Sequence, residues 1–211
     1  MSTGRLYELM FRFIIIGDCF VGKTALTQRF ISDQYMNHYE ATIGVDFGAN
    51  IVKLSNGVNV KCQIWDTAGQ ENFAPLIKSY YKDIAGAIIV FDVANRSSFT
   101  HLKFWLKEFE NNNNANYPIS KILIGNKIDI CNRVISYEEA KAFATEHNLS
   151  YQETSVKNNI NVRNVFMTLC EDIYKNKDLN KGIVVNNESH LSLSSNKEGK
   201  NRSYYDCCYI S

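Results

Sequence analysis

The sequence predicts an α/β fold: a six-stranded, mostly parallel sheet with one antiparallel edge strand and helices on both faces. Three observations support this prediction. The continuous apolar runs FRFIII, GAIIVFD and KILIGN are typical of strands that are buried on both faces of a sheet. Segments with helical periodicity lie between and after these runs, and strands that alternate with helices favour parallel pairing. The Asn56-Gly57 pair between two strand-like segments indicates the one hairpin that supplies the antiparallel edge.

The first half of the chain contains a strand, a helix and the hairpin. FRFIII (11–16) predicts a short buried strand, and KTALTQRFI (23–31) predicts the helix after it. The hairpin arms are DFGANIVKLS (46–55) and VNVKCQIWD (58–66). Apolar and polar residues alternate in the second arm, which indicates an antiparallel strand with one half-polar face.

Three apolar stripes at helical spacing predict helices in the second half. The middle one, SYEEAKAFATEHN (136–148), opens with Ser136 and Glu139, which form a capping box. We assign all three stripes to core packing. The first and third consist of Phe99, Leu102, Leu106 and Phe109, and of Val162, Phe166, Leu169 and Ile173.

The composition is that of an ordinary soluble globular protein. The 211 residues are 45% hydrophobic and 21% charged, with a formal net charge of +1. Since nucleic-acid binding needs a concentrated basic surface, we expect no nucleic-acid partner. No apolar stretch approaches the roughly 18–20 residues of a membrane span. We expect one monomeric domain over residues 1–177 and a disordered, hypervariable tail over residues 178–211.

The stretch GDCFVGKT lies between the first predicted strand and the first predicted helix. It fits the pattern G-x-x-x-x-G-K-[ST], so we expect a P-loop NTPase fold. In such a loop, backbone N–H groups converge on phosphate oxygens, Lys23 supplies charge to the β- and γ-phosphates, and the Thr24 hydroxyl binds Mg²⁺. The expected nucleotide contacts are Gly17, Asp18, Cys19, Phe20, Val21, Gly22, Lys23, Thr24 and Ala25.

The segment IWDTAGQ (64–70) ends the second arm of the hairpin. An acidic residue at a strand end near a P-loop is the usual partner for Mg²⁺, and here this residue is Asp66. The sequence thus indicates a nucleoside triphosphate with magnesium. At this point both ATP and GTP remain open.

The base is selected by GNKID (125–129), at the end of an apolar strand. Asn126, Lys127 and Asp129 match the guanine-reading pattern N-K-x-D. Asp129 can accept hydrogen bonds from the guanine ring N–H and amine, a pair that adenine does not offer, and this can discriminate roughly 10⁴-fold. We expect Asn126 to tie the loops together and the Lys127 stem to cover one face of the base. The loop ETSVK resembles a companion base-contacting loop, with Ser155, Val156 and Lys157.

In this order, the motifs resemble those of small GTPases of the Ras superfamily, specifically the Rab branch, over essentially the whole chain. YEATIGVDFGA (39–49) resembles the first switch, and WDTAGQENF (65–73) looks like a Rab-type signature. The resemblance implies that Thr42 coordinates Mg²⁺ and senses the γ-phosphate, and that Tyr35 stacks across the guanine face. It also implies a GTP-binding and GTP-hydrolysing switch that regulates vesicle-mediated protein transport.

The same resemblance implies how hydrolysis proceeds. Gln70 would orient the attacking water and Gly69 would donate its N–H to the γ-phosphate, while Lys23 neutralises developing charge. No arginine falls between Asp33 and Phe47. We therefore expect slow hydrolysis until an activating protein supplies an arginine.

The partners implied by the resemblance are an exchange factor, a GTPase-activating protein, effectors, an escort protein and a GDP-dissociation inhibitor. Effectors would contact an exposed hydrophobic surface, although its aromatic residues could instead simply pack in the core. The residues of this expected surface are Ile43, Phe47, Trp65 and Tyr80.

Three residues depart from the family pattern. Phe20 stands where a small residue is usual, Asn72 replaces an arginine, and Val156 replaces an alanine. We expect GTP binding to survive Phe20, because the ligands of the loop are backbone N–H groups. Val156 could loosen guanine, and Asn72 removes a charge from the second switch.

The final residues DCCYIS predict lipid attachment at Cys207 and Cys208. The pair resembles a doubly geranylgeranylated terminus, and the last four residues also fit a box for one farnesyl group. Without a basic run nearby, durable anchoring favours two lipids over one. The expected location is the cytoplasmic face of intracellular membranes, with cycling through the cytosol.

Two other functions compete with the leading hypothesis. One is a guanine-nucleotide-dependent interaction module that hardly hydrolyses, which Phe20 favours and Gln70 opposes. The other is a small P-loop kinase, which the N-K-x-D motif and the lack of an arginine-rich lid oppose.

Overall fold

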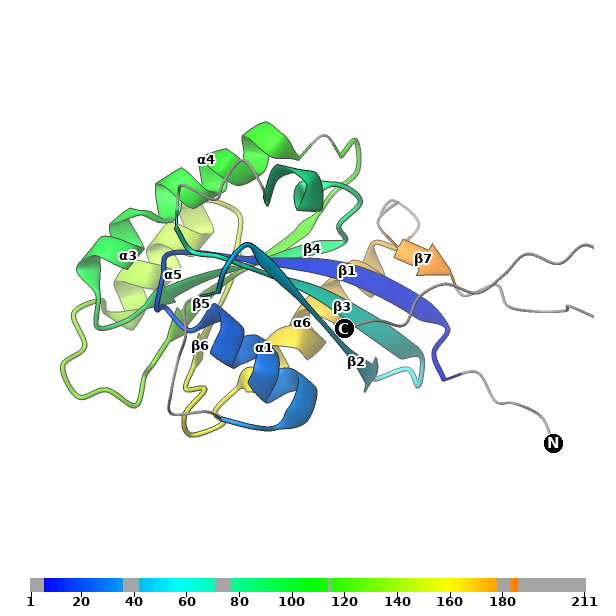
Figure 1. Cartoon of the computed structure of the whole chain (residues 1–211), viewed down its shortest axis with the longest axis horizontal. Helices are drawn as coiled ribbons and strands as arrows, with labels where there is room; N and C mark the ends of the chain where they lie inside the picture. Colours follow the sequence, from blue (N-terminus) through cyan, green and yellow to red (C-terminus); the bar gives the residue numbers. More distant parts are fainter. Residues whose placement is uncertain (1–5, 36–41, 71–76, 114, 178–182, 186–211) are drawn as a thin grey trace, which may run out of the picture.

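The computed structural model describes residues 6–35, 42–70, 77–113, 115–177 and 183–185 (Figure 1). One twisted sheet forms the middle layer, and helices cover both of its faces. The predicted α/β class is confirmed.

Six strands follow one another across the sheet in the order β2-β3-β1-β4-β5-β6. All neighbours pair in parallel except β2 and β3, which are antiparallel and form the edge. This confirms the predicted sheet. The strands are β1 (Leu9–Ile16), β2 (Val45–Lys53), β3 (Asn59–Thr67), β4 (Gly86–Asp92), β5 (Ser120–Asn126) and β6 (Ser150–Thr154).

A seventh strand, β7 (Ile183–Val185), pairs antiparallel with Leu9–Phe11 at the start of β1. Strand β4 pairs only with Phe13–Ile16, so the start of β1 has a free side that β7 occupies. The sequence did not predict this pairing. β7 falls within the predicted tail, 178–211, and the other tail residues lie outside the described part of the chain.

The helices flank the sheet in two groups, with α1 and α6 on one face and α3, α4 and α5 on the other (Figure 1). None of the helices in the described ranges is both long and apolar enough to cross a membrane. The helices are α1 (Lys23–Ser32), α3 (Arg96–Thr100), α4 (Leu102–Asn112), α5 (Tyr137–Glu146) and α6 (Val162–Lys175), with a short 3₁₀ helix, η2 (Lys78–Tyr81).

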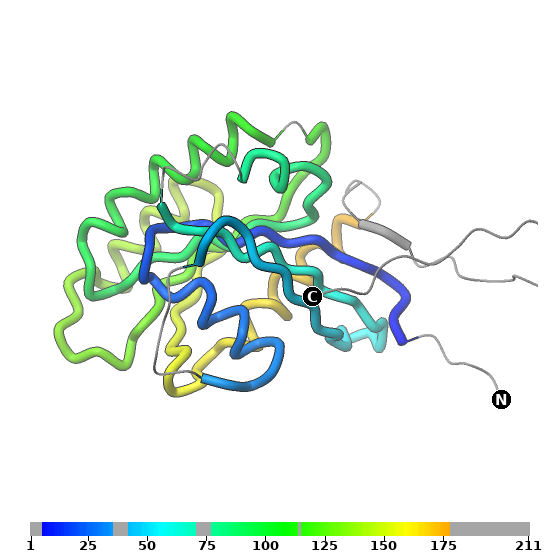
Figure 2. Tube along the Cα trace, in the orientation of Figure 1, coloured from blue at the N-terminus to red at the C-terminus, as the bar shows by residue number. Residues whose placement is uncertain are grey.

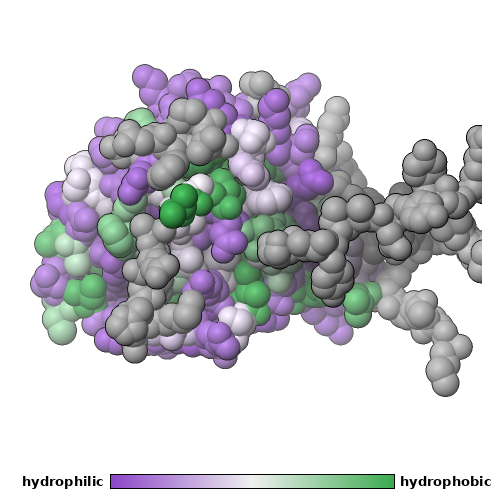
Figure 3. Space-filling view, viewed as in Figure 1, coloured by the Kyte–Doolittle hydropathy of each residue, from purple (hydrophilic) through white to green (hydrophobic). Residues whose placement is uncertain are grey.

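Each face of the sheet has its own hydrophobic core. On one face, Phe30 of α1 stacks on Phe166 of α6 at 3.7 Å between ring centroids. On the other, Trp105 and Phe109 of α4 are buried with η2 and α5. The stripes that we assigned to packing supply both cores. On the face shown in Figure 3, hydrophilic side chains cover most of the described surface, and hydrophobic ones gather in small patches.

Local sequence signals begin and end these elements as predicted. Gly57 has φ +91° in the hairpin turn, a conformation that costs glycine little. The Ser136 hydroxyl accepts a hydrogen bond from the Glu139 backbone N–H at 3.1 Å, which caps α5. The stripe around Phe99 is divided at His101 into α3 and α4, which follow each other closely along the tube in Figure 2.

Candidate nucleotide-binding site

A cavity of about 410 Å³ opens at the carboxyl ends of the parallel strands, where ligands bind on open α/β sheets. The loops after β1, β5 and β6 meet there with the start of α1. The lining residues are Cys19, Phe20, Gly22, Lys23, Thr24, Ala25, Tyr35, Thr42, Gly69, Asn126, Lys127, Asp129, Ile130, Val156 and Lys157. All but Ile130 are among the residues expected from the sequence.

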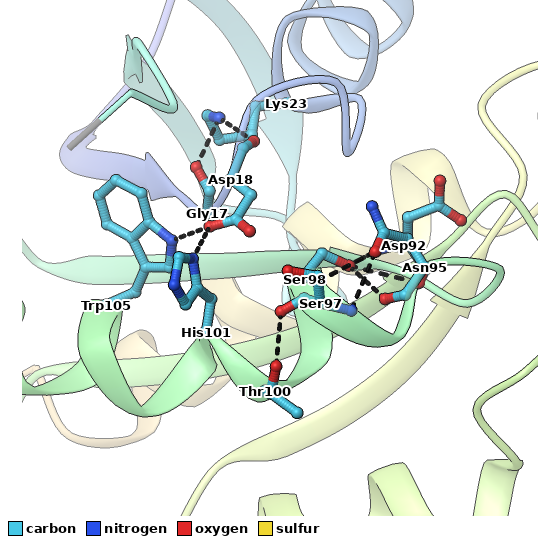
Figure 4. A network of polar contacts seen from close by, with 10 residues as sticks. All are labelled: Gly17, Asp18, Lys23, Asp92, Asn95, Ser97, Ser98, Thr100, His101 and Trp105. Carbon is cyan, nitrogen blue, oxygen red and sulfur yellow. Dashed lines mark hydrogen bonds and ion pairs between the residues drawn. The ribbon is translucent and has the colours of Figure 1, made fainter.

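The loop between β1 and α1 folds around the ammonium group of Lys23. Lys23 Nζ donates to the Gly17 carbonyl at 2.7 Å and to the Asp18 carbonyl at 2.8 Å (Figure 4). Burial lowers the pKa of Lys23 to about 8, against the opposing attraction of the Asp66 carboxylate. A buried ammonium held only by neutral carbonyls is favourably placed to attract an anion such as a phosphate group.

Three side-chain oxygens gather beside this lysine. Thr24 Oγ1 donates to Asp66 Oδ2 at 2.5 Å and lies 2.7 Å from Thr42 Oγ1. The other carboxylate oxygen, Asp66 Oδ1, is buried without a hydrogen-bond partner. Burial raises the pKa of Asp66 to about 6, although the Thr24 hydrogen bond and Lys23 act in the opposite direction. Two hydroxyls and a carboxylate with an unused oxygen fit a hard cation such as Mg²⁺.

The opposite end of the cavity is built from amide and hydroxyl contacts. Asn126 Nδ2 donates to the Val21 carbonyl at 2.8 Å, and Asn126 Oδ1 accepts from the Thr154 hydroxyl at 3.0 Å. These bonds join the loop after β1 to the ends of β5 and β6. The Ser155 hydroxyl donates to Asp129 Oδ1 at 2.6 Å, which orients the carboxylate.

Two further charged residues support this end and were not found from the sequence. Asp92 Oδ2 lies 2.7 Å from the Lys127 ammonium. Arg29 of α1 donates to the carbonyls of Val156 at 3.1 Å and Lys157 at 3.0 Å. Asp92 could have been found as an acidic residue at the end of a central strand, beside the strand that carries Lys127. Arg29 gave no local signal, because its partners lie more than a hundred residues away.

Gly69, after β3, lies directly against the phosphate loop. A Cβ atom added at Gly69 would come within 2.4 Å of Asp18 C and Cys19 N, so only glycine fits. Gln70 is exposed and does not line the cavity. Asn72 lies outside the described residues.

The comparisons with known proteins agree with this geometry. Residues 12–175 match the Ras family. The chain belongs to the Ras family. It is 38% identical over 207 residues to Ras-related protein SEC4 of Saccharomyces cerevisiae, an alignment that covers 98% of this chain and 95% of that protein.

The predicted Rab-type assignment is confirmed by these matches. This Ras-family protein binds GTP and GDP, hydrolyses GTP, and acts as a switch in vesicle-mediated transport.

Four expected contact residues of this Ras-family protein lie one hydrogen bond behind the cavity wall. Each bonds to a residue that lines the cavity: two carbonyls accept from Lys23, one accepts from Asn126, and one hydroxyl donates to Asp129. These residues are Gly17, Asp18, Val21 and Ser155.

Phe20 is an unusual residue for the rim of this site. Its φ is +62°, and 72% of its surface is exposed although it borders the cavity. A non-glycine residue in this conformation costs about 1–2 kcal/mol. The strain therefore lies at the mouth of the nucleotide site.

Three of the four expected effector residues of this Ras-family protein, the aromatic ones, form one cluster. The Trp65 ring lies 4.8 Å from Phe47 and 5.1 Å from Tyr80, between centroids. Phe47 is 49% exposed and Ile43 85% exposed. The three aromatic residues also line a groove of about 530 Å³.

Proposed function

We propose that this Ras-family GTPase requires Mg²⁺, held by Thr24, Thr42 and Asp66. The single observation that carries the proposal is the buried, unpartnered oxygen Asp66 Oδ1, since such an atom is costly unless a ligand satisfies it. The Thr24 and Thr42 hydroxyls lie within 2.7 Å of each other beside it. When bound, the ion would neutralise the charge of the phosphate oxygens.

Three residues of the chain then take part in GTP hydrolysis. Lys23 holds the phosphates with its ammonium group, and the Gly69 N–H donates to the γ-phosphate. Gln70 is exposed and does not line the cavity, so its side chain would turn toward the cavity to orient the attacking water. Because no arginine is present between Asp33 and Phe47, hydrolysis is slow until an activating protein contributes one.

The γ-phosphate changes the surface that partners read. Thr42 and Gly69 both line the cavity. Thr42 directly precedes Ile43 in the chain, and Gly69 follows Trp65 by four residues. With GTP bound, these two residues hold their segments in place, and after hydrolysis the segments relax. Effectors contact Phe47 and Trp65, while an exchange factor and an activating protein set the timing.

Lipids on Cys207 and Cys208 attach the protein to the cytoplasmic face of intracellular membranes. The adjacent cysteines support two prenyl groups, because one chain without a basic run anchors only marginally. An escort protein would present the chain for prenylation, and a GDP-dissociation inhibitor would return it to the cytosol. An intact mass from cells that shows neither prenyl group would contradict this part of the proposal.

Calorimetry on the full-length, nucleotide-stripped protein tests the proposed site. We expect tight GDP binding with magnesium and much weaker binding when EDTA replaces it. Asp66→Ala should lose most of this difference, whereas Asp46→Ala on the neighbouring strand should keep it. If the wild-type protein takes up no GDP with magnesium, the proposal fails.

The second candidate is a module that binds guanine nucleotide but hardly hydrolyses it. The exposed ring of Phe20 at the rim favours it, because a bulky side chain there can obstruct an incoming arginine. A multiple-turnover assay with a matched activating protein separates the two: acceleration by the partner supports the switch, and none supports the module.

A further inference from the structure

The phosphate loop contains a carboxylate, Asp18, whose presence needs an explanation. Two like charges at 4 Å repel by about 1 kcal/mol even in water, and more in a partly buried site. An acidic residue in a loop that binds a polyanion is therefore costly if its side chain faces the ligand. The structure shows that it faces the other way, toward helix α4 (Figure 4).

The Asp18 carboxylate is held by two aromatic nitrogen atoms. Trp105 Nε1 donates to Asp18 Oδ1 at 2.7 Å, and His101 Nδ1 lies 3.2 Å from the same oxygen. Trp105 is 1% exposed, and Asp18 Oδ1 is the acceptor of its N–H, so removal of Asp18 would take away this acceptor. The two residues thus depend on each other for a hydrogen bond.

The Trp105 side of this contact is fixed. Its ring lies in the core with Leu102 and Phe109 of the same helix. The preceding helix, α3, is capped by Asn95, whose side chain accepts from two backbone N–H groups. The Ser98 hydroxyl of α3 also accepts from the Asp92 N–H at the end of β4, which ties the helix to the sheet.

The Asp18 backbone is the point where the catalytic groups meet. Its carbonyl accepts from Lys23 Nζ at 2.8 Å. The peptide between Asp18 and Cys19 also touches Gly69, where an added Cβ would clash at 2.4 Å. A shift of the Asp18 backbone would therefore disturb both the Lys23 hydrogen bond and the packing against Gly69.

We propose that Trp105 is a positioning residue of the GTPase site, which acts through Asp18 to hold the phosphate loop and the Gly69 peptide in the binding geometry. His101 makes the second, exposed contact and contributes less. The inference rests on the proposed roles of Lys23 and Gly69. It adds a residue from α4, outside every nucleotide motif in the sequence.

The test measures GDP dissociation and single-turnover GTP hydrolysis in the full-length protein with magnesium. Trp105→Phe keeps an aromatic ring and removes the N–H donor. We expect dissociation about tenfold faster and hydrolysis severalfold slower, as for loss of one hydrogen bond to a charged group. Asp18→Ala should show the same changes, and His101→Ala a change of less than about threefold.

Two controls distinguish positioning from loss of stability. Phe109→Leu disturbs the same helix and core without touching the loop, so it should lower Tm and leave both rates unchanged. Asp18→Asn keeps an acceptor for Trp105, and its dissociation rate should lie between those of wild type and Asp18→Ala. The double variant Trp105→Phe/Asp18→Ala should dissociate no faster than the faster single variant, because both remove the same bond.

The inference is overturned if Trp105→Phe and Asp18→Ala both keep wild-type rates, if their effects add fully, or if Phe109→Leu accelerates dissociation equally. Each of these results leaves nucleotide binding by the wild-type protein intact. Failure of the wild-type protein to bind GDP would instead contradict the proposed function.

Discussion

The two ends of the nucleotide cavity differ in whether their polar groups are satisfied without a ligand. At the end with Asn126 and Asp129, where we expect the base and which we call the base end, polar groups satisfy one another: Asn126 bonds to Val21 and Thr154, Ser155 to Asp129, and Asp92 to Lys127. At the phosphate end, burial lowers the pKa of Lys23 and raises the pKa of Asp66, which favours the neutral form of each group. Asp66 Oδ1 also has no hydrogen-bond partner. The base end is thus complete without ligand, whereas the phosphate end needs one to satisfy its charges.

The largest expected effect is the loss of Asp129, the carboxylate that we expect to bind the guanine base. Asp129→Ala should weaken GDP binding by about 10³-fold or more, because it removes the acceptor of the two hydrogen bonds that we expect from guanine. Because Asp129→Ala also leaves the buried Ser155 hydroxyl without its acceptor, Tm should fall as well. Calorimetry with GDP and ADP checks both the affinity and the preference, with the exposed Glu146→Ala as control. An unchanged preference for GDP would mean that the base is read elsewhere.

At the phosphate end we expect a substitution to weaken binding without lowering stability. Lys23→Met should weaken GDP binding by about 10²-fold through the lost charge-assisted hydrogen bonds. Without nucleotide, the free energy of unfolding of this variant should nevertheless equal that of the wild type or exceed it by up to about 1 kcal/mol, because a buried charge is removed. Urea unfolding of the stripped protein measures this. A clear loss of stability would show that this end, too, is satisfied without ligand.

The base end should instead lose stability when one of its residues is removed. Asn126 is 2% exposed, and Asn126→Ala leaves the Val21 carbonyl and the Thr154 hydroxyl without their partner. We expect unfolding free energy to fall by about 1–3 kcal/mol in the absence of nucleotide. The exposed Asn158→Ala serves as the control in the same unfolding experiment.

The lowered pKa of Lys23 predicts that nucleotide binding depends on pH. In the free protein burial holds this pKa at about 8, and bound phosphates would raise it again. The complex therefore binds more protons than the free protein, so affinity for GDP should fall above pH 8 by up to about tenfold per pH unit. Calorimetry at pH 9 in two buffers of different ionisation enthalpy measures the proton uptake. Equal heats in both buffers would contradict the assignment.

The smallest expected effect concerns strain at the rim. Phe20 has φ +62°, and Phe20→Gly should raise unfolding free energy by about 1 kcal/mol, because glycine adopts this conformation without strain. Thermal unfolding of the stripped protein tests this, with Phe104→Gly on α4 as the destabilising counterpart. A lower Tm for Phe20→Gly would mean that the ring has a stabilising contact.

Local patterns in the sequence predicted most of the fold and of the cavity wall. The hairpin at Asn56-Gly57, the cap at Ser136 and the phosphate loop each depend on a few adjacent residues, so they could be read directly. The apolar periodicity predicted that α4 packs in the core, but periodicity indicates only which face of a helix is buried. It could not predict the hydrogen bond from Trp105 to Asp18, because the two residues are 87 positions apart in the sequence.

The other unpredicted features share this long-range character. The ion pair between Asp92 and Lys127 depends on two strands that become neighbours only in the sheet. The pairing of β7 depends on where β4 leaves β1 uncovered. In both cases, the residues around one partner give no indication of which residue or strand the other partner is.

The position of β7 decides from which side a tether would pull. Its pairing with Leu9–Phe11 places β7 at the end of β1 that lies away from the phosphate loop, and Leu9 is about 26 Å from Gly17 at roughly 3.3 Å per strand residue (Figure 1). If the proposed lipids on Cys207 and Cys208 tether the protein, the described chain would therefore be joined to the membrane through the end of the sheet that lies away from the mouth of the cavity.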